Sequence, residues 1–98
     1  MYKDVYTRQA QKDATLIKRA GLQPITDKLV DIIRKDPFQN PPPYEALKGD
    51  RKGSYSRRIN KQHRFVYQVL PNTENLIDET GTPYEGIVKI IRMWTHYE

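Results

Sequence analysis

The first half of the chain carries apolar residues at spacings that predict one short strand followed by two helices. Residues 2–6 are rich in strand-forming side chains, and Thr7 follows them as a suitable helix N-cap. Apolar side chains then recur three or four residues apart, as on one face of a helix, first up to Gly21 and then again up to the stop at Pro37. They are Ala10, Ala14 and Ile17 in the first helix, and Leu22, Ile25, Leu29, Ile32 and Ile33 in the second.

In the second half the pattern changes to one that predicts three strands. Four prolines lie in residues 37–43, so this stretch is expected to be an extended surface connection, and residues 44–48 follow as a short segment. Polar and apolar side chains then alternate, which is the pattern of a half-buried strand. The strands are expected at residues 55–59, 63–70 and 86–94, with a turn at 60–62 and a polar loop at 71–84.

Together these elements predict an α+β fold of the order β-α-α-β-β-β, formed by one domain that spans residues 1–98. A chain of 98 residues is too short for two independent cores. The helices are expected to form an antiparallel hairpin that packs on one face of an antiparallel sheet. The other face then stays open, and because it carries Arg, Lys, Tyr and His side chains, it is where we expect a ligand.

The positive charge of the chain is concentrated in residues 48–64. The chain has 17 Lys and Arg against 12 Asp and Glu, a net charge of +5. Residues 48–64 hold seven of the basic side chains and one acid, a charge of +6, which leaves ten basic and eleven acidic side chains elsewhere. Such a concentration favours a polyanionic partner, and nucleic acid in particular. A solvated basic face without a ligand is the alternative.

The composition excludes several kinds of chemistry. The chain has no Cys, so disulfides, thiolate ligands and a cysteine nucleophile are absent, and its two His argue against a structural zinc site. We therefore expect no metal and no cofactor. No apolar run is long enough to cross a bilayer, and residues 1–8 lack the apolar stretch of a signal peptide. We therefore expect a cytoplasmic protein without membrane contact.

The remaining chemistry suits RNA cleavage, because RNA supplies its own nucleophile, the 2′-OH. The protein then needs a base for the 2′-OH proton, cations for the charge on the phosphate and an acid for the leaving oxygen. Glu45 is a candidate base, and His96 is a candidate proton donor because an imidazole titrates near neutral pH. The alternatives are a solvated loop acid for Glu45 and a frayed tail for His96 and for Tyr97, a candidate base-stacking ring.

Arg57, Arg58 and Arg64 suit phosphate binding because a planar guanidinium holds two oxygens at once. Consecutive residues of a strand point to opposite faces, so only one of Arg57 and Arg58 shares a face with the substrate unless a bulge intervenes. Arg64 can share that face, whereas His63 then points away from it and is expected to be a partly buried structural histidine. Two further residues are candidates for stacking on a base: Tyr55 and Tyr67.

Four motifs occur in an order that is more specific than any one of them. They are PFQNPPPYEALK at residues 37–48, SRRIN at 56–60, QHRFVY at 62–67 and MWTHY at 93–97. With these motifs the chain resembles, over nearly its whole length, the Txe/YoeB family of type II toxins in the wider RelE-like superfamily. The resemblance implies the RelE-like β-α-α-β-β-β fold.

Members of the family that the chain resembles are ribosome-dependent mRNA endoribonucleases, which cut by metal-independent attack of the 2′-OH. The resemblance implies that Glu45 is the general base, that His96 is the general acid and that Arg64 stabilises the transition state. It also implies a set of residues that bind or orient the phosphate, to which the basic segment adds two more candidates. The set from the resemblance is Lys48, Arg58 and Tyr97, and the added candidates are Arg57 and Lys52.

The resemblance also implies partners. A YefM/Phd-like antitoxin holds such toxins inactive, the ribosome and its mRNA are the target, and DNA is contacted only indirectly, through the antitoxin. The resemblance is also compatible with a homodimer. The alternative from a different class is a noncatalytic RNA- or ribosome-binding module, in which the same cations contact phosphates and tyrosines stack on bases.

Overall fold

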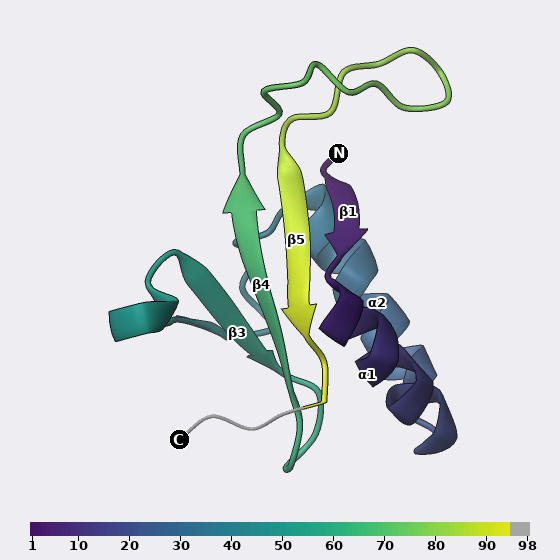
Figure 1. Ribbon diagram of the computed structural model, residues 1–98, viewed down its shortest axis with the longest axis vertical. Coiled ribbons are helices and arrows are strands. Elements are labelled where there is room, and N and C mark those ends of the chain that lie inside the picture. Colours follow the sequence, from purple (N-terminus) through teal and green to yellow (C-terminus); the bar gives the residue numbers. More distant parts are fainter. Residues whose placement is uncertain (95–98) are drawn as a thin grey trace.

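The computed structural model describes residues 1–94, and Figure 1 shows their elements. The elements in chain order are β1 (Lys3–Tyr6), α1 (Arg8–Arg19), α2 (Gln23–Lys35), β2 (Tyr44–Ala46), a 3-10 helix η1 (Gly49–Arg51), β3 (Ser54–Arg58), β4 (Arg64–Leu70) and β5 (Ile87–Arg92). The predicted α+β class and the predicted order of the helices and strands are confirmed. β2 is an additional strand, formed within the short segment 44–48.

The five strands form one mixed sheet in the order β1-β5-β4-β3-β2. The pairs β2–β3, β3–β4 and β4–β5 are antiparallel, whereas β1 runs parallel to β5, with Lys3 opposite Ile87 and Tyr6 opposite Ile90. The prediction of a purely antiparallel sheet is therefore wrong at this edge. The helical hairpin returns the chain to the start of β1, where the amide of Tyr2 donates to the carbonyl oxygen of Arg34. Residues 36–43 then cross to β2 at the opposite edge, and the last strand, β5, returns to pair with β1. Side-chain periodicity does not encode that pairing.

The ends of both helices follow the signals in the sequence. Thr7 caps α1, because its Oγ1 accepts a hydrogen bond from the amide of Ala10 at 3.0 Å. The same hydroxyl donates to the carbonyl oxygen of Ile91 at 2.9 Å, which ties the start of α1 to β5. Gly21 has a φ of 73° in the turn between the helices, a conformation that favours glycine. α2 ends just before Pro37, as predicted.

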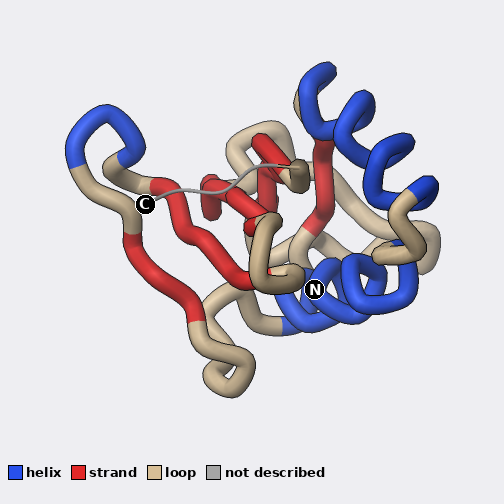
Figure 2. Tube along the Cα trace, turned by 90° about the horizontal axis from the view of Figure 1, so that it is seen from below, coloured by secondary structure: helices blue, strands red, loops and turns tan. Residues whose placement is uncertain are grey.

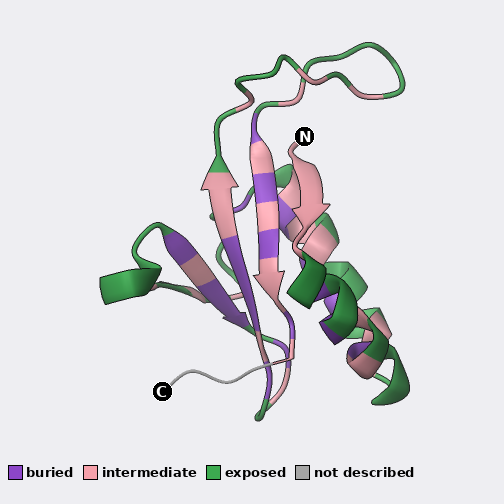
Figure 3. Ribbon diagram, in the orientation of Figure 1, coloured by how far each residue is buried: buried purple, intermediate pink, exposed green. Residues whose placement is uncertain are grey.

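The core lies between the helices and one face of the sheet (Figure 1, Figure 2). Buried residues of the helices pack against buried residues of β4 and β5, which are drawn in purple in Figure 3. The helix residues are Ala10, Ile17, Leu29 and Ile33, and the strand residues are Phe65, Tyr67, Val88 and Ile90. Each large apolar side chain contributes about 1.5–3 kcal/mol when it is fully buried. Ile25, which the pattern placed on the apolar face, is 42% exposed.

The connection between β4 and β5 extends beyond one end of the sheet (Figure 1). Asn72 holds it together: its Nδ2 donates to the carbonyl oxygens of Leu76 and Tyr84, and its Oδ1 accepts from the amide of Leu76. Arg64 begins β4 and this loop follows the end of β4, so the loop and Arg64 lie at opposite ends of the strand. Among residues 1–94, no helix combines the length and the apolar character needed to cross a membrane.

Candidate active site

Alternation along β3 sends its two consecutive arginines to opposite faces of the sheet. Arg57 lies on the side of the core, while Arg58 pairs with Arg64 of β4 on the face that the helices leave uncovered. On β2, Glu45 pairs with Ser56, which shares its face with Arg58. The predicted separation of the two arginines is confirmed. The register of three adjacent strands therefore places Glu45, Arg58 and Arg64 on one surface.

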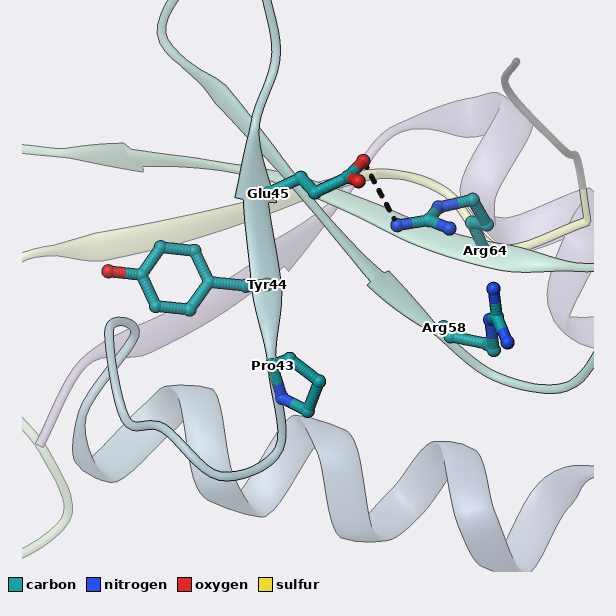
Figure 4. Close-up of a pocket in the computed structure, with 5 residues that line it drawn as sticks. All are labelled: Pro43, Tyr44, Glu45, Arg58 and Arg64. Atoms are coloured by element: carbon teal, nitrogen blue, oxygen red, sulfur yellow. Dashed lines mark hydrogen bonds and ion pairs between the residues drawn. The ribbon is translucent and has the colours of Figure 1, made fainter.

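Glu45 and Arg64 face each other in a pocket of about 340 Å³ on this surface (Figure 4). Nη2 of Arg64 lies 3.3 Å from Oε2 of Glu45, and Nε of Arg64 donates a hydrogen bond to Oγ of Ser56 at 2.6 Å. The side chain of Glu45 is 70% exposed and that of Arg64 is 18% exposed. The other residues of the lining are Pro43, Tyr44 and Arg58. A carboxylate that solvent and ligands can reach therefore lies beside an oriented guanidinium.

The contact between Glu45 and Arg64 is suited to binding a ligand rather than to stabilising the fold. An exposed ion pair of this kind contributes about 0–1 kcal/mol, because water competes for both charges. Arg64 is nevertheless held in place, since its hydrogen-bond partner Ser56 is completely buried. A cation that is oriented in advance needs little reorganisation when negative charge develops beside it. The pocket can therefore accept a phosphate at its arginines, with the Glu45 carboxylate next to it.

Arg57 does not belong to this surface. Its side chain is completely buried, and its guanidinium donates to the carbonyl oxygens of Pro37 and Pro42 and, at 3.1 Å, to the hydroxyl of Tyr67. The Arg57 guanidinium carbon also lies 5.0 Å from the centroid of the Tyr44 ring. The prediction that Arg57 binds phosphate is therefore wrong. Its donors instead bind the proline-rich connection at residues 37–43 to the sheet.

Neither of the two candidate stacking tyrosines faces the Glu45 pocket. Tyr67 is completely buried and its hydroxyl donates to the carbonyl oxygen of Pro37 at 2.7 Å, so the prediction that it stacks on a base is wrong. Burial raises the pKa of Tyr67 in spite of the nearby Arg57 guanidinium, and the phenol therefore remains a hydrogen-bond donor. Tyr55 is half-buried and lies edge-on to the ring of Phe38, at a centroid distance of 5.1 Å.

Lys48 and Lys52 lie beside the Glu45 pocket rather than in it. Both side chains are exposed, and both residues line a second pocket, of about 520 Å³, formed where the chain leaves β2, passes through η1 and enters β3. Leu47 and Tyr55 contribute apolar surface to this second pocket. Lys48 follows Glu45 by three residues, so the second pocket is formed further along the same part of the chain, beyond the end of β2. The two lysines therefore add positive charge close in sequence to Glu45 but outside its pocket.

Two predicted site residues, His96 and Tyr97, lie outside the described residues. The last described residue is Trp94. Its ring stacks on the imidazole of His63, with a centroid distance of 3.7 Å and an angle of 22° between the planes. His63 is 6% exposed, which confirms that it is a buried residue.

Sequence reasoning missed Asp13, which joins α1 to the end of β5. Asp13 is 1% exposed, and its Oδ2 accepts hydrogen bonds from the amide of Met93 at 3.0 Å and from Nε of Arg92 at 2.8 Å. Burial alone would raise the pKa of Asp13, but these hydrogen bonds outweigh it and hold the pKa below its usual value of 3.8. The signal was present in the pattern, because Asp13 follows Ala10 by three residues and therefore lies on the apolar stripe.

The described residues offer acid–base and electrostatic chemistry at one place, the Glu45 pocket. Glu45 can accept a proton, and Arg58 and Arg64 can stabilise negative charge on a bound phosphate. Within residues 1–94, no three His, Cys, Asp or Glu side chains cluster closely enough to hold a metal ion. The set of side chains in the pocket is therefore one that can act on a phosphodiester.

The chain is similar to known toxin sequences. The family described as the YoeB-like toxin of bacterial type II toxin-antitoxin systems matches residues 2–97. The chain is 36% identical to a Toxin YoeB from Streptomyces coelicolor over 72 residues, which are 74% of this chain and 76% of that toxin. It is 41% identical to a Toxin YoeB from Synechocystis over 59 residues, which are 60% of this chain and 62% of that toxin. The match therefore spans less than two thirds of the Synechocystis toxin.

Solved structures show the same fold. A YoeB/ParE toxin from Agrobacterium tumefaciens has a TM-score of 0.78 at 29% identity, with coverage of 97% of this chain and 99% of that chain. A YoeB dimer from Staphylococcus aureus has a TM-score of 0.70 at 24% identity and 98% coverage of both chains, a likeness of fold alone. Since the family match extends over residues 2–97, the chain belongs to the YoeB-like toxins of bacterial type II toxin-antitoxin systems.

Proposed function

We propose that this toxin is a ribosome-dependent endoribonuclease that inhibits translation by cutting mRNA. One observation carries the proposal: the Glu45 carboxylate lies 3.3 Å from the guanidinium of Arg64, in a pocket that also contains Arg58. A carboxylate and two arginines are the groups that cleavage of RNA by its own 2′-OH requires on the nucleophile side. Family membership supports the same assignment.

In the proposed reaction Glu45 is the general base. Its carboxylate takes the proton of the 2′-OH, the 2′ oxygen forms a bond to phosphorus, and the bond from phosphorus to the 5′ oxygen breaks. His96 is the general acid that gives a proton to the leaving 5′ oxygen. The products are one RNA end with a 2′,3′-cyclic phosphate and one with a 5′-OH. The nucleophile belongs to the RNA, and Glu45 and His96 carry out both proton transfers, so the reaction needs no metal ion.

The cations have separate roles in the proposal. Arg64 stabilises the charge that develops on the phosphate in the transition state, and its hydrogen bond to Ser56 supports this role because it orients the guanidinium. Arg58 binds the same phosphate from the neighbouring strand. The remaining residues that bind or orient the RNA are Lys48, Lys52 and Tyr97.

Dependence on the ribosome fits the openness of the pocket. Glu45 is 70% exposed, so the protein alone leaves an RNA strand free to adopt many geometries beside it. In-line attack requires one of these geometries, and holding it contributes a large part of the rate of such reactions. We propose that the ribosome supplies this constraint by presenting mRNA in a fixed conformation. The toxin would then act in the cytoplasm, where translation takes place.

The proposed inhibitor is a YefM/Phd-like antitoxin. A toxin of this fold from Staphylococcus aureus has been solved in a YoeB-YefM complex, which supports the same pairing here. An acidic antitoxin segment would complement the charge of +6 in residues 48–64. DNA would be contacted only through the antitoxin. A homodimer is also proposed, supported by the YoeB dimer from the same organism.

The chemistry of the RNA ends tests the proposal. Purified toxin is added to ribosomes that carry a defined mRNA, and in parallel to the same mRNA without ribosomes. The expected result is cleavage only on ribosomes, with 2′,3′-cyclic phosphate and 5′-OH ends, and no cleavage by Glu45→Gln. Ends with a 5′-phosphate would contradict the 2′-OH mechanism. Stable binding that leaves the mRNA intact would instead favour a noncatalytic RNA- or ribosome-binding module.

A further inference from the structure

β2, the strand that carries Glu45, is short and lies at the edge of the sheet. It has three residues and pairs with β3 on one side. The connection before it, residues 37–43, contains four prolines, which have no amide hydrogen to donate. A short edge strand that follows such a segment depends on contacts from elsewhere in the fold. The position of Glu45 therefore depends on what holds residues 37–43.

Arg57 holds this connection at two points. Its Nη2 donates to the carbonyl oxygen of Pro37 at 3.0 Å and its Nη1 to that of Pro42, so one planar guanidinium binds both ends of the connection. The hydroxyl of Tyr67 accepts from Nε of Arg57 at 3.1 Å and donates to the carbonyl oxygen of Pro37 at 2.7 Å. Arg57, Tyr67 and Pro37 thus form a closed ring of hydrogen bonds, in which both side chains are completely buried.

The same guanidinium contacts the residue next to Glu45. Tyr44 pairs with Arg57 across β2 and β3, and the centroid of its ring lies 5.0 Å from the guanidinium carbon. Consecutive residues of a strand point to opposite faces, so a Tyr44 ring on the side of Arg57 places Glu45 on the side of the pocket (Figure 4). Arg57 therefore holds the backbone at Pro42 and the ring of Tyr44, both directly before Glu45.

The guanidinium of Arg57 supplies something that an apolar side chain could not. Burial of a charge costs free energy that its partners must offset, and an apolar side chain of similar volume would fill the space without that cost. The partners of Arg57 are carbonyl and hydroxyl oxygens and aromatic rings. Only directed donors can fix two carbonyl groups in place. The distinctive contribution of Arg57 is therefore the orientation of the chain that leads into β2.

We propose that Arg57 is a positioning residue for Glu45. It acts through Pro42 and Tyr44 and does not touch the RNA. The catalytic consequence rests on the proposed function: the base must come within hydrogen-bond reach of the 2′-OH, and a misplacement of about 1 Å can lower a rate about 100-fold. A residue that only stabilised the fold would change the folded fraction and not the cleavage rate of the folded toxin.

Single-turnover cleavage on programmed ribosomes tests this role. Arg57→Lys keeps a positive charge but lacks the planar fork that reaches Pro37, Pro42 and Tyr67 together. At saturating toxin, and well below its unfolding temperature, we expect this variant to cleave more slowly by about tenfold or more, with little change in its affinity for ribosomes. Cleavage at the native rate by folded Arg57→Lys would overturn the inference.

Two controls separate positioning from stability. Ile17→Ala opens a cavity at a completely buried side chain of α1, which packs on α2, β1 and β5, so it destabilises the fold away from residues 37–43. Gln39→Ala removes an exposed bond within the connection, from Nε2 of Gln39 to the carbonyl oxygen of Pro41 at 3.2 Å. We expect both variants to cleave like the native toxin. A loss in either control equal to that of Arg57→Lys would overturn the role given to the guanidinium.

If Arg57→Lys does not fold, Tyr67→Phe replaces it. This variant removes only the hydroxyl that accepts from Nε of Arg57 and donates to the carbonyl oxygen of Pro37. We expect the same combination of slower cleavage and little change in affinity for ribosomes. A native rate in Tyr67→Phe would overturn the inference.

A spin label on β2 distinguishes failure of the inference from failure of the proposed function. The chain has no cysteine, so Ala46→Cys gives one labelling site, at an exposed residue directly after Glu45. Arg57→Lys is expected to raise the mobility of the label in the electron paramagnetic resonance spectrum, whereas the two control variants should leave it unchanged. An inactive native toxin with this response would contradict the proposed function only. Unchanged mobility in Arg57→Lys would overturn the positioning role even if the toxin cleaves mRNA.

Discussion

Arg64 contacts Glu45 through Nη2 at 3.3 Å, while its Nε remains bonded to the buried hydroxyl of Ser56 at 2.6 Å. One guanidinium therefore links an exposed carboxylate to the interior of the sheet. The bond to Ser56 fixes where the positive charge lies, and the bond to Glu45 leaves that carboxylate accessible. The Arg64 guanidinium is therefore oriented in advance while the pocket stays open. A site that receives a phosphate between a base and a cation needs both properties.

Ser56→Ala is expected to lower the cleavage rate about tenfold, because a hydrogen bond to a charged group is worth about 1.5–3 kcal/mol and here it orients Arg64. Single-turnover cleavage on programmed ribosomes measures the effect. Ser54→Ala is the matched control, since Ser54 is also buried on β3 and faces the same side two residues earlier. Equal losses in the two variants would show that the Ser56 hydroxyl does not act through Arg64.

Arg58→Ala and Arg64→Ala are expected to weaken ribosome binding as well as cleavage, because both cations contact phosphate in the proposed complex. Glu45→Gln, in contrast, should stop cleavage with little loss of binding. Arg58→Lys serves as the control for charge: it keeps the charge but loses the planar fork, so it should bind better than Arg58→Ala and cleave less well than the native toxin. Sedimentation with ribosomes measures binding. Full cleavage by Arg58→Ala would remove Arg58 from the site.

Arg57→Met is expected to destabilise the fold by about 2–4 kcal/mol, because it removes the donors that bind the partly buried carbonyl of Pro42, the carbonyl of Pro37 and the hydroxyl of Tyr67. Urea unfolding followed by circular dichroism measures the change. Arg58→Met is the matched control on the neighbouring position, where the side chain is exposed and the loss of stability should be within about 0.5 kcal/mol. Similar unfolding midpoints for the two variants would contradict the buried role of Arg57.

Leu29→Asp is expected to unfold the domain, because Leu29 is 5% exposed and the substitution would bury an unpaired charge between α2 and the sheet. Lys28→Asp tests the same substitution on the exposed side of the same helix turn and should leave the fold intact. Thermal unfolding monitored by circular dichroism distinguishes them. A native melting transition in Leu29→Asp would mean that α2 presents a different face to the core.

Asp13 also predicts how stability depends on pH. The pKa of its carboxyl is lowered in the folded state from the value of 3.8 that holds for an unfolded chain. A lowered pKa contributes stability that is fully present above pH 3.8 and is lost as the pH falls through the folded-state value. The native toxin should therefore lose more stability between pH 6 and pH 3 than Asp13→Asn does. Urea midpoints at several pH values measure the difference, and identical acid profiles would contradict the lowered pKa.

Local patterns in the sequence were sufficient for most of the fold. The cap at Thr7, the glycine turn at Gly21 and the stop before Pro37 each act within a few residues, so their chemistry is readable without the tertiary structure. The parallel pairing of β1 with β5 could not be predicted from the sequence, because it depends on the path of the chain between β1 and the later strands. β2 was missed for a related reason, since three residues with one neighbour carry almost no periodic signal.

The site shows the same limit. Strand alternation predicted that Arg57 and Arg58 diverge, but charge alone could not tell which of them is buried beneath the proline-rich connection. Strand alternation also places Ser56 on the same face as Arg58, two residues away. The hydrogen bond from Arg64 to Ser56 could not be predicted, because it depends on the register between β3 and β4. The position of Asp13 on the apolar stripe of α1 was visible in the pattern, but its role was not, because its partners, among them Met93, lie at the other end of the chain.

The most direct test of the account is to map new mRNA ends in a cell-free translation reaction, with the native toxin and Glu45→Gln side by side. The two proteins differ by one atom group at the proposed base, and circular dichroism checks that both are folded. We expect new ends at codon-phased positions with the native toxin and none above background with Glu45→Gln. Equal cleavage by both proteins, or intact mRNA with a folded and ribosome-bound native toxin, would contradict it.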